Sequence, residues 1–197
     1  AIAANDADAL QPALTEAMDA GIKVISLDSA VNKDSRQTHI QQADPEKIGR
    51  GLIQAAYEMV DGNGGIAVLS ATAQATNQNL WIEWMKKELE ENPEKYANTP
   101  LVKVAYGDDD PTKSTSETQA LLTDSSIKVI IAPTTVGMLA AGKVLQDKQS
   151  DVKLTGLGLP SEMAPFIEDG TCPWMYLWNP VDIGCLLYTS DAADDKA

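Results

Sequence analysis

Short apolar runs alternate with helical patterns along the chain, and this alternation constrains the fold more than any other feature. The runs, rich in apolar and β-branched residues, occupy residues 22–27, 66–69, 101–105, 127–132 and 152–157. Between them lie longer segments with apolar residues at helical spacing or with helix-start signals such as Asp44-Pro45-Glu46. Strands that alternate with helices form βαβ units, in which a parallel sheet is covered on both faces. The pattern therefore predicts an α/β fold with parallel sheets flanked by helices.

The helices are expected over about residues 9–18, 45–59, 77–91, 111–122, 136–146 and 160–170. Residues 37–41 and 174–178 are expected to add strands, the second being the last full strand. Residues 1–4 read like the end of a strand already under way, and no signal peptide precedes them. We therefore expect the chain to begin inside a fold.

The chain is strongly acidic, with 15 Lys and Arg, 29 Asp and Glu and a formal charge of −14. This balance argues against a nucleic-acid or anionic-membrane partner. No apolar run approaches the ~20 residues that a membrane helix needs, so we expect no direct membrane insertion. Cys172 and Cys185 give no disulfide framework and no metal spacing, and the single histidine, His39, excludes two-histidine metal sites. The sequence therefore predicts neither a metal nor a cofactor.

The segment from Ile66 to Trp81 brings polar side chains to one end of the expected sheet. A short apolar strand is followed by a small-residue loop and by a helix that starts with the uncharged side chains of residues 76–79, Thr-Asn-Gln-Asn. In open α/β sheets, ligands bind outside the carboxyl ends of strands, where helix N-termini present free N–H groups. Without a cation or a glycine-rich loop, this set suits a neutral, hydroxyl-rich ligand better than a phosphate. The alternative is that Thr76 or Asn77 only caps the helix.

Polar residues also follow other expected strands. Asp28 follows the run 22–27, Thr134 and Thr135 follow 127–132, and Trp178 ends the last expected strand. Asp28 is able to accept two sugar hydroxyls through charge-assisted hydrogen bonds, and Trp178 is able to lie against the C–H face of a sugar ring. The alternatives are turn capping by Asp28 and core packing by Trp178.

No catalytic pattern is visible in the sequence. The run Asp108-Asp109-Asp110 is interpreted as a helix cap that complements the helix dipole, because a calcium loop would space its ligands at alternate positions. His39 is interpreted as structural, since one histidine makes no relay. The run Gly156 to Ser161 begins like a dinucleotide fingerprint, but a proline and a serine break it. Asp28 is the only carboxylate that the pattern places at the strand ends, so an enzyme is the least favoured hypothesis.

Five parts of the chain occur in the same order in a known family. They are Asp28 after a strand, residues 76–81 (Thr-Asn-Gln-Asn-Leu-Trp), 131–137 (Ile-Ala-Pro-Thr-Thr-Val-Gly), 156–163 (Gly-Leu-Gly-Leu-Pro-Ser-Glu-Met) and 178–184 (Trp-Asn-Pro-Val-Asp-Ile-Gly). In these parts the chain resembles the periplasmic type I sugar-binding proteins of ABC importers. The strongest resemblance is to rhamnose-binding proteins, with autoinducer-2-binding proteins as near relatives. It covers about residues 1–184.

The resemblance implies the periplasmic-binding-protein type I fold, in which two α/β lobes joined by three chain crossings close on a sugar by hinge motion. It implies that residues 1–41 are the remnant of the N-terminal lobe and that residues 42–177 form the C-terminal lobe. Residues 178–184 would then be a hinge crossing back to the N-terminal lobe. On this interpretation the chain is an N-terminally truncated fragment with one nearly complete lobe.

The resemblance also implies a function and a ligand site. The family's binding positions carry over to Asp28, Asn77, Gln78, Pro133, Thr134, Thr135 and Trp178. The implied protein is periplasmic or on the extracellular surface, captures a rhamnose-like monosaccharide and delivers it to the membrane permease of an ABC importer. Autoinducer-2 binders usually carry Asp at the positions of Asn77 and Thr134, which favours rhamnose over autoinducer-2 or another sugar.

An alternative of another class is the ligand-sensing domain of a transcription regulator, which shares this fold. A basic helix-turn-helix before the first lobe would mark such a protein. The acidity of the chain and its transport-type motifs argue against this alternative.

Residues 185–197 depart from the family pattern. From Cys185 to Asp194 the chain resembles one translated reading frame of a transposon-based sequencing adapter. We therefore expect residues 185–197 to be adapter read-through, and the natural protein to continue past Gly184 with a different sequence.

Overall fold

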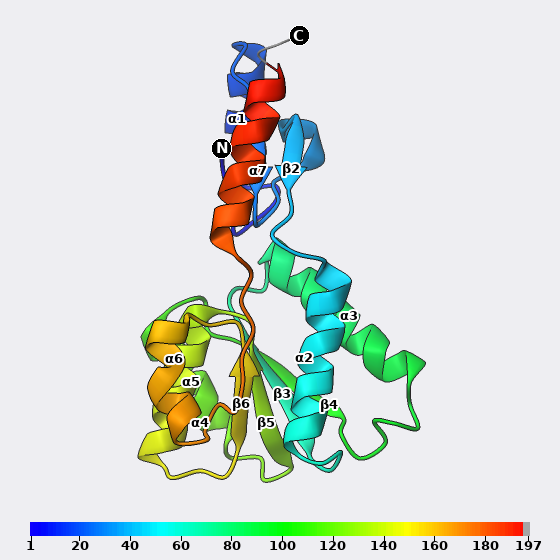
Figure 1. The fold of residues 1–197 in the computed structure, drawn as a ribbon, viewed down its shortest axis with the longest axis vertical. Coiled ribbons are helices and arrows are strands. Elements are labelled where there is room, and N and C mark those ends of the chain that lie inside the picture. Colours follow the sequence, from blue (N-terminus) through cyan, green and yellow to red (C-terminus); the bar gives the residue numbers. More distant parts are fainter. Residues whose placement is uncertain (195–197) are drawn as a thin grey trace. The chain divides into compact units, whose positions relative to one another are not determined.

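The computed structural model describes residues 1–194 and shows helices that alternate with parallel strands (Figure 1). The chain divides into two compact units, each treated by itself below. The larger unit comprises Glu46–Ala73 and Leu80–Leu177, and the smaller one comprises Ala1–Pro45, Gln74–Asn79 and the C-terminal segment from Trp178. The predicted α/β class with parallel sheets flanked by helices is confirmed.

The larger unit is built on a four-stranded parallel sheet with the strand order β4-β3-β5-β6. The strands are β3 (Gly65–Ser70), β4 (Leu101–Tyr106), β5 (Ile127–Ala132) and β6 (Lys153–Gly156). Strand β3 pairs with both β4 and β5, and its Val68 lies opposite Val104 on one side and Ile131 on the other. Every residue of β3 is buried, as expected for a parallel strand that is covered on both faces.

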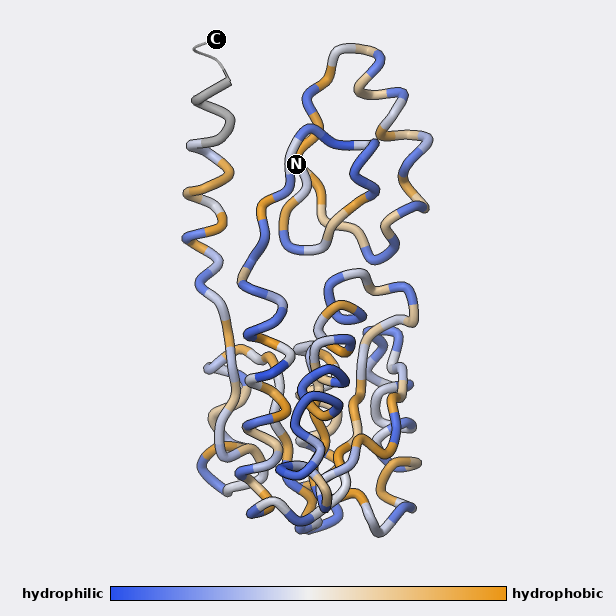
Figure 2. Tube along the Cα trace, turned by 90° about the vertical axis from the view of Figure 1, so that its right-hand side faces the viewer, coloured by the Kyte–Doolittle hydropathy of each residue, from blue (hydrophilic) through white to orange (hydrophobic). Residues whose placement is uncertain are grey.

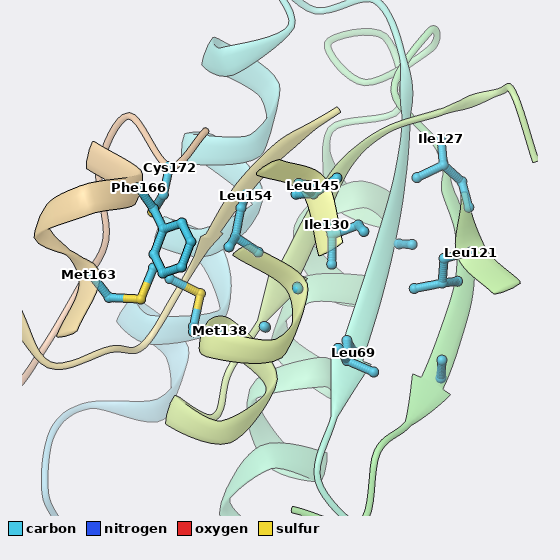
Figure 3. Packing of buried hydrophobic residues seen from close by; sticks show 14 residues of the cluster. Leu69, Leu121, Ile127, Ile130, Met138, Leu145, Leu154, Met163, Phe166 and Cys172 are labelled. Carbon is cyan, nitrogen blue, oxygen red and sulfur yellow. The ribbon is translucent and has the colours of Figure 1, made fainter. Parts of the chain in front are cut away.

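Helices cover the two faces of this sheet (Figure 1). On one face lie α4 (Pro111–Leu121), α5 (Thr135–Asp147) and α6 (Pro160–Glu168), and on the other lie α2 (Pro45–Met59) and the larger part of α3 (Thr76–Glu91). The core on the first face joins strand residues such as Leu69 and Ile130 to Met138 of α5 and Phe166 of α6 (Figure 3). Burying one such side chain fully contributes about 1.5–3 kcal/mol, so this cluster fixes the strand ends that carry the site.

The helices α2 and α3 pack closely at Gly49. A Cβ atom at this position would lie 2.5 Å from the Cβ of Trp84 and 2.6 Å from the carbonyl oxygen of Trp81. Next to this contact, the guanidinium of Arg50 lies 2.6 Å from the carboxylate of Glu88 and 5.2 Å from the centre of the Trp84 ring. The fit therefore depends on a residue without a side chain at position 49.

The smaller unit contains two short parallel strands, β1 (Ile25–Leu27) and β2 (Thr38–Ile40). It also contains α1 (Gln11–Asp19), a 3-10 helix η1 (Lys33–Ser35) and α7 (Pro180–Asp194). Ile2 forms a parallel bridge with Ser26, and its backbone N–H donates to the carbonyl oxygen of Ile25 at 2.9 Å. The first residues therefore extend the pairing of β1, as their composition predicts.

The strand predicted over residues 174–178 is wrong. The structure shows there one isolated parallel bridge, between Leu157 and Tyr176. Strand β6 ends at Gly156, whose φ of 155° departs from strand geometry, and Pro173 has no N–H to donate to a ladder. The pairing therefore stops after a single bridge.

Helix α7 crosses the boundary expected between Gly184 and Cys185, and polar and apolar residues alternate along its turns (Figure 2). Ile183 is buried in this helix, whereas Val181 and Tyr188 are exposed. The adapter origin of residues 185–197 stays a prediction, and residues 195–197 lie outside the described part of the chain. Among residues 1–194, none of the helices has the length and apolar composition that a membrane crossing requires.

Candidate functional site

The carboxyl end of β5 carries three residues of the predicted site. Pro133 and Thr134 are buried and Thr135 is exposed at the start of α5. Thr134 is the N-cap residue of α5 and has extended backbone geometry, with φ −150° and ψ 139°. Its side chain makes no hydrogen bond to the helix. Instead, its Oγ1 donates a hydrogen bond to Oδ1 of Asp109.

Asp109 belongs to the loop that follows β4, so the Thr134 hydroxyl links the ends of β4 and β5, the two strands that flank β3. The same loop is tied to β3, because the N–H of Gly107 donates to Ser70 O at 2.8 Å and the N–H of Asp108 donates to Ala71 O at 3.0 Å. This places a carboxylate at the carboxyl ends of the strands in the larger unit. The expectation that Asp28 is the only carboxylate at the strand ends is therefore wrong.

The three adjacent aspartates of this loop have three different partners. Asp110 accepts a hydrogen bond from the N–H of Lys113 at 2.7 Å and caps α4, while Asp108 forms an ion pair of 2.5 Å with the Nζ of Lys113. Asp109 points to Thr134 instead. The interpretation of the run as a helix cap is confirmed for Asp110 and wrong for Asp109. The sequence carries no signal for this difference, because it arises from the positive φ angles of Asp108 (54°) and Asp109 (51°).

Asp28 follows β1 directly in the smaller unit. Its backbone has a φ of 58°, and its N–H donates to Ile40 O at 3.0 Å. Its Oδ1 is buried and has no hydrogen-bond partner within the part of the chain that the structure describes. Burial raises the pKa of this carboxyl, and the nearby His39 opposes the shift. The carboxylate oxygen is therefore short of donors, which is unusual for a buried polar group.

The residues beside Asp28 are held by side-chain hydrogen bonds. Ser26 Oγ lies 2.8 Å from Nδ1 of His39 and accepts a hydrogen bond from Nη1 of Arg36 at 2.9 Å. The other ring nitrogen of His39 lies 3.0 Å from Oε1 of Gln41. Burial lowers the pKa of His39. Both ring nitrogens thus have partners, Ser26 on β1 and Gln41 just after β2, in agreement with the structural role expected for His39.

Asn77 and Gln78 lie in the first turn of α3, which begins at Thr76, one residue before the expected start. Asn77 Oδ1 accepts a hydrogen bond from the N–H of Gln78 at 2.8 Å, and the Gln78 side chain is buried. This bond is local to the helix start, so the capping alternative retains support. Trp178 is half-buried where the chain enters the C-terminal segment.

The predicted site residues are divided between the two units. Asp28, Asn77, Gln78 and Trp178 belong to the smaller unit, and Pro133, Thr134 and Thr135 belong to the larger one. Two hollows of the larger unit, of about 310 and 440 Å³, are lined by residues away from these strand ends, such as Ile127 and Leu101. Within residues 1–194 there is no group of three or more His, Cys, Asp or Glu side chains suited to a metal ion.

The chain is similar to a family of known domains and to several solved structures. The periplasmic binding protein domain matches residues 1–190. An ABC transporter solute-binding protein from Clostridium phytofermentas with bound L-rhamnose shares 52% sequence identity and a TM-score of 0.88, covering 94% of this chain and 59% of its own. A sugar ABC transporter protein from Actinomyces odontolyticus shares 43% identity and a TM-score of 0.72, covering 93% and 59%.

A third solved structure is LsrB from Clostridium saccharobutylicum in complex with AI-2. It shares 25% identity and a TM-score of 0.76, covering 86% of this chain and 56% of its own. The chain thus spans less than two thirds of the length of each of these proteins.

Proposed function

The chain belongs to the periplasmic binding protein domain family, among the sugar-binding proteins of ABC transporters, and from this premise we propose that it captures L-rhamnose or a closely similar monosaccharide. The protein acts outside the cytoplasm and delivers the sugar to the membrane permease of an ABC importer. Its role is binding and release without catalysis. The ligand is held by Asp28, Asn77, Gln78, Pro133, Thr134, Thr135 and Trp178.

The observation that carries the proposal is the buried Oδ1 of Asp28, which has no hydrogen-bond partner among residues 1–194. A hydrogen bond to a charged group contributes about 1.5–3 kcal/mol, and leaving a buried charged group without one costs at least as much. A sugar hydroxyl supplies the missing donor in a charge-assisted bond. The ligand thus gains affinity by donating a hydrogen bond to a carboxylate oxygen that accepts none from residues 1–194.

The similarity to the L-rhamnose-bound protein at 52% identity supports a deoxysugar as the ligand. The alternative within the family is autoinducer-2, which the 25% identical LsrB binds. The uncharged side chains of Asn77 and Thr134 support rhamnose, because autoinducer-2 binders usually carry Asp at these two positions. In both cases, binding stabilises the closed state only if the ligand contacts groups that come together in that state.

The boundaries expected from the sequence complete the proposal. Residues 1–41 belong to the N-terminal lobe and residues 42–177 form the C-terminal lobe. Residues 178–184 are the hinge crossing between them. Residues 185–197 are adapter read-through.

The test is the melting temperature of the full-length protein against L-rhamnose, D-glucose, D-arabinose and autoinducer-2. A ligand bound only by the folded state at 100 times its Kd stabilises that state by about 2.7 kcal/mol. We expect L-rhamnose to raise the melting temperature, Asp28→Ala to abolish the shift and Asp34→Ala, an exposed aspartate of the same unit, to keep it. No shift with any sugar overturns the proposal.

A further inference from the structure

The hydrogen bond between Thr134 and Asp109 sets the direction of a hydroxyl at the proposed sugar site. A threonine hydroxyl has one proton to donate and two lone pairs that accept. Thr134 Oγ1 gives its proton to Asp109 Oδ1. An ionised carboxylate only accepts hydrogen bonds, so the direction of this bond is fixed. Oγ1 is therefore able only to accept a hydrogen bond from a ligand.

The side chain of Thr134 is fixed on its other branch as well. A Cβ atom at Gly137 would lie 2.9 Å from Cγ2 of Thr134, so the methyl group occupies the space that this glycine leaves. Thr134 is 8% exposed. The methyl group against Gly137 and the hydroxyl on Asp109 together hold the side chain in one rotamer.

Asp109 itself is held in place by its loop. The backbone bonds from Gly107 to Ser70 and from Asp108 to Ala71 tie the loop to the end of β3. A Cβ atom at Gly107 would lie 2.2 Å from Oγ of Ser114, so the loop also packs directly on α4. Asp109 adopts a φ of 51°, which non-glycine residues take up infrequently. The loop therefore presents one carboxylate to Thr134 while its neighbours bind Lys113.

We propose that Asp109 is a positioning residue for the sugar site, which keeps the Thr134 hydroxyl as an acceptor and so selects a ligand hydroxyl that donates to it. The inference rests on the proposed sugar-binding function and adds a residue that the sequence analysis did not place at the site. It predicts that affinity depends on a hydroxyl that donates a hydrogen bond at one ring position of the sugar. A fluorine in place of the hydroxyl that faces Thr134 has no proton to donate, so the bond is lost.

The test uses the full-length protein and calorimetric titration with L-rhamnose and its 2-, 3- and 4-deoxyfluoro analogues. Asp109→Gly removes the carboxylate and suits the positive φ of this position. Asp108→Gly is the matched control, because Asp108 has a φ of 54° and its carboxylate binds Lys113. Asp109→Asn retains an oxygen that accepts from Thr134. Thr134→Val and the double variant Asp109→Gly/Thr134→Val complete the cycle.

We expect Asp109→Gly and Thr134→Val each to weaken L-rhamnose binding by about 3- to 10-fold, the range for one neutral hydrogen bond. The double variant should bind no more weakly than Thr134→Val alone, because Asp109 acts through Thr134. Asp108→Gly should bind like the wild type, and Asp109→Asn should retain most of the affinity. One fluoro analogue should lose less affinity in Asp109→Gly than in the wild type, since the released hydroxyl is then able to turn its proton toward the ligand.

Unchanged L-rhamnose binding by Asp109→Gly, or additive losses in the double variant, would overturn this inference while the proposed function stands. Wild-type protein that binds none of the sugars overturns the proposed function and the inference together. Identical penalties for all three fluoro analogues in the wild type and in Asp109→Gly also contradict the inference. This last comparison separates a role in orienting the hydroxyl from a general loosening of the loop.

Discussion

Ser26 Oγ lies 2.8 Å from Nδ1 of His39, across the two parallel strands β1 and β2. The register pairs Ser26 directly with His39, and the next pair, Leu27 with Ile40, immediately precedes Asp28 on β1. The proposed sugar-binding carboxylate therefore stands two residues beyond a hydrogen-bonded Ser–His pair. Because His39 is held by this hydrogen bond, its protonation is coupled to the folded structure next to Asp28.

The first prediction concerns stability against pH. Burial lowers the pKa of His39 below its ordinary value of 6.5, so the folded state binds fewer protons than the unfolded state as the pH falls through 6.5. Stability is therefore lost on acidification in this range. In His39→Asn, which keeps a polar atom near Nδ1, the melting temperature should vary less between about pH 5 and 8. Identical pH profiles of the wild type and the variant would contradict a contribution of His39 to the loss of stability on acidification.

The second prediction concerns Asp28 as a ligand contact. Asp28→Asn should weaken L-rhamnose binding by about 10- to 100-fold, because a hydrogen bond to a charged group contributes about 1.5–3 kcal/mol. Burial raises the pKa of Asp28 above its ordinary value of 3.8. Binding should therefore decline at a higher pH than a normal aspartate would predict, as the carboxylate becomes protonated. Calorimetric titration over a pH series measures both effects.

The control for Asp28 is Asp34→Asn, which removes an exposed charge from the same unit. It should leave the affinity unchanged. Equal losses in the two variants would show that net charge, and not a contact from Asp28, governs binding.

The third prediction concerns the contact between α2 and α3. Gly49→Ala should destabilise the protein by about 1–3 kcal/mol, the usual cost of overpacking, because the new Cβ would lie 2.6 Å from the carbonyl oxygen of Trp81. Gly51→Ala, on the same helix, places its Cβ in open space. It should stabilise the protein by about 0.5–1 kcal/mol, because alanine is the better helix former. Melting temperatures that move in the same direction in both variants would refute this packing argument.

The fourth prediction concerns the ion pairs of Arg50. Burial raises the pKa of Glu88, but hydrogen bonds from Arg50 and Tyr96 outweigh it, and the net pKa lies below the ordinary 4.5. The carboxylate thus contributes stability above pH 4.5, and the contribution is lost as the pH falls through the lowered pKa. Glu88→Gln should be less stable than the wild type at pH 7, with a difference that shrinks on acidification.

The matched variant for Glu88 is Glu83→Gln, on the same helix. Glu83 pairs with Lys87 at 3.0 Å, and both side chains are more exposed than Glu88. Exposed pairs contribute little, so Glu83→Gln should unfold close to the wild type in thermal melts. A larger loss of stability in Glu83→Gln than in Glu88→Gln would contradict the contribution assigned to the ion pair between Arg50 and Glu88.

Local signals predicted much of the fold. Helix α2 begins at Pro45 and ends at Met59, and β5 runs from Ile127 to Ala132, with the bounds that the sequence indicates. In both cases the signal is local, since a proline at the helix start and a run rich in β-branched residues need no distant partner. The strand expected at residues 174–178 depended on a ladder with β6, but β6 ends at Gly156 and the pairing is limited to a single bridge between Leu157 and Tyr176.

The candidate site was most predictable where a residue closely follows a strand. Thr134 is such a residue, because the end of β5 is clear from the sequence and only Pro133 lies between that end and Thr134. Asp109 is not, because its contact with Thr134 spans 25 residues and depends on a loop with two successive positive φ angles. Composition at positions 108–110 is uniform, so nothing in it distinguishes the aspartate that caps α4 from the one that binds Thr134. The binding roles and the lobe boundaries remain predictions.

The decisive measurement is a calorimetric titration of L-rhamnose into the full-length protein, beside autoinducer-2 and D-glucose. We predict saturable binding of L-rhamnose to a single site, with weaker or no binding of the other two ligands. Because the burial of Asp28 Oδ1 with no donor among residues 1–194 supports the sugar site, the same titration of Asp28→Ala should lose the signal. Absence of heat with L-rhamnose in the wild type, or wild-type affinity in Asp28→Ala, would contradict the proposed site.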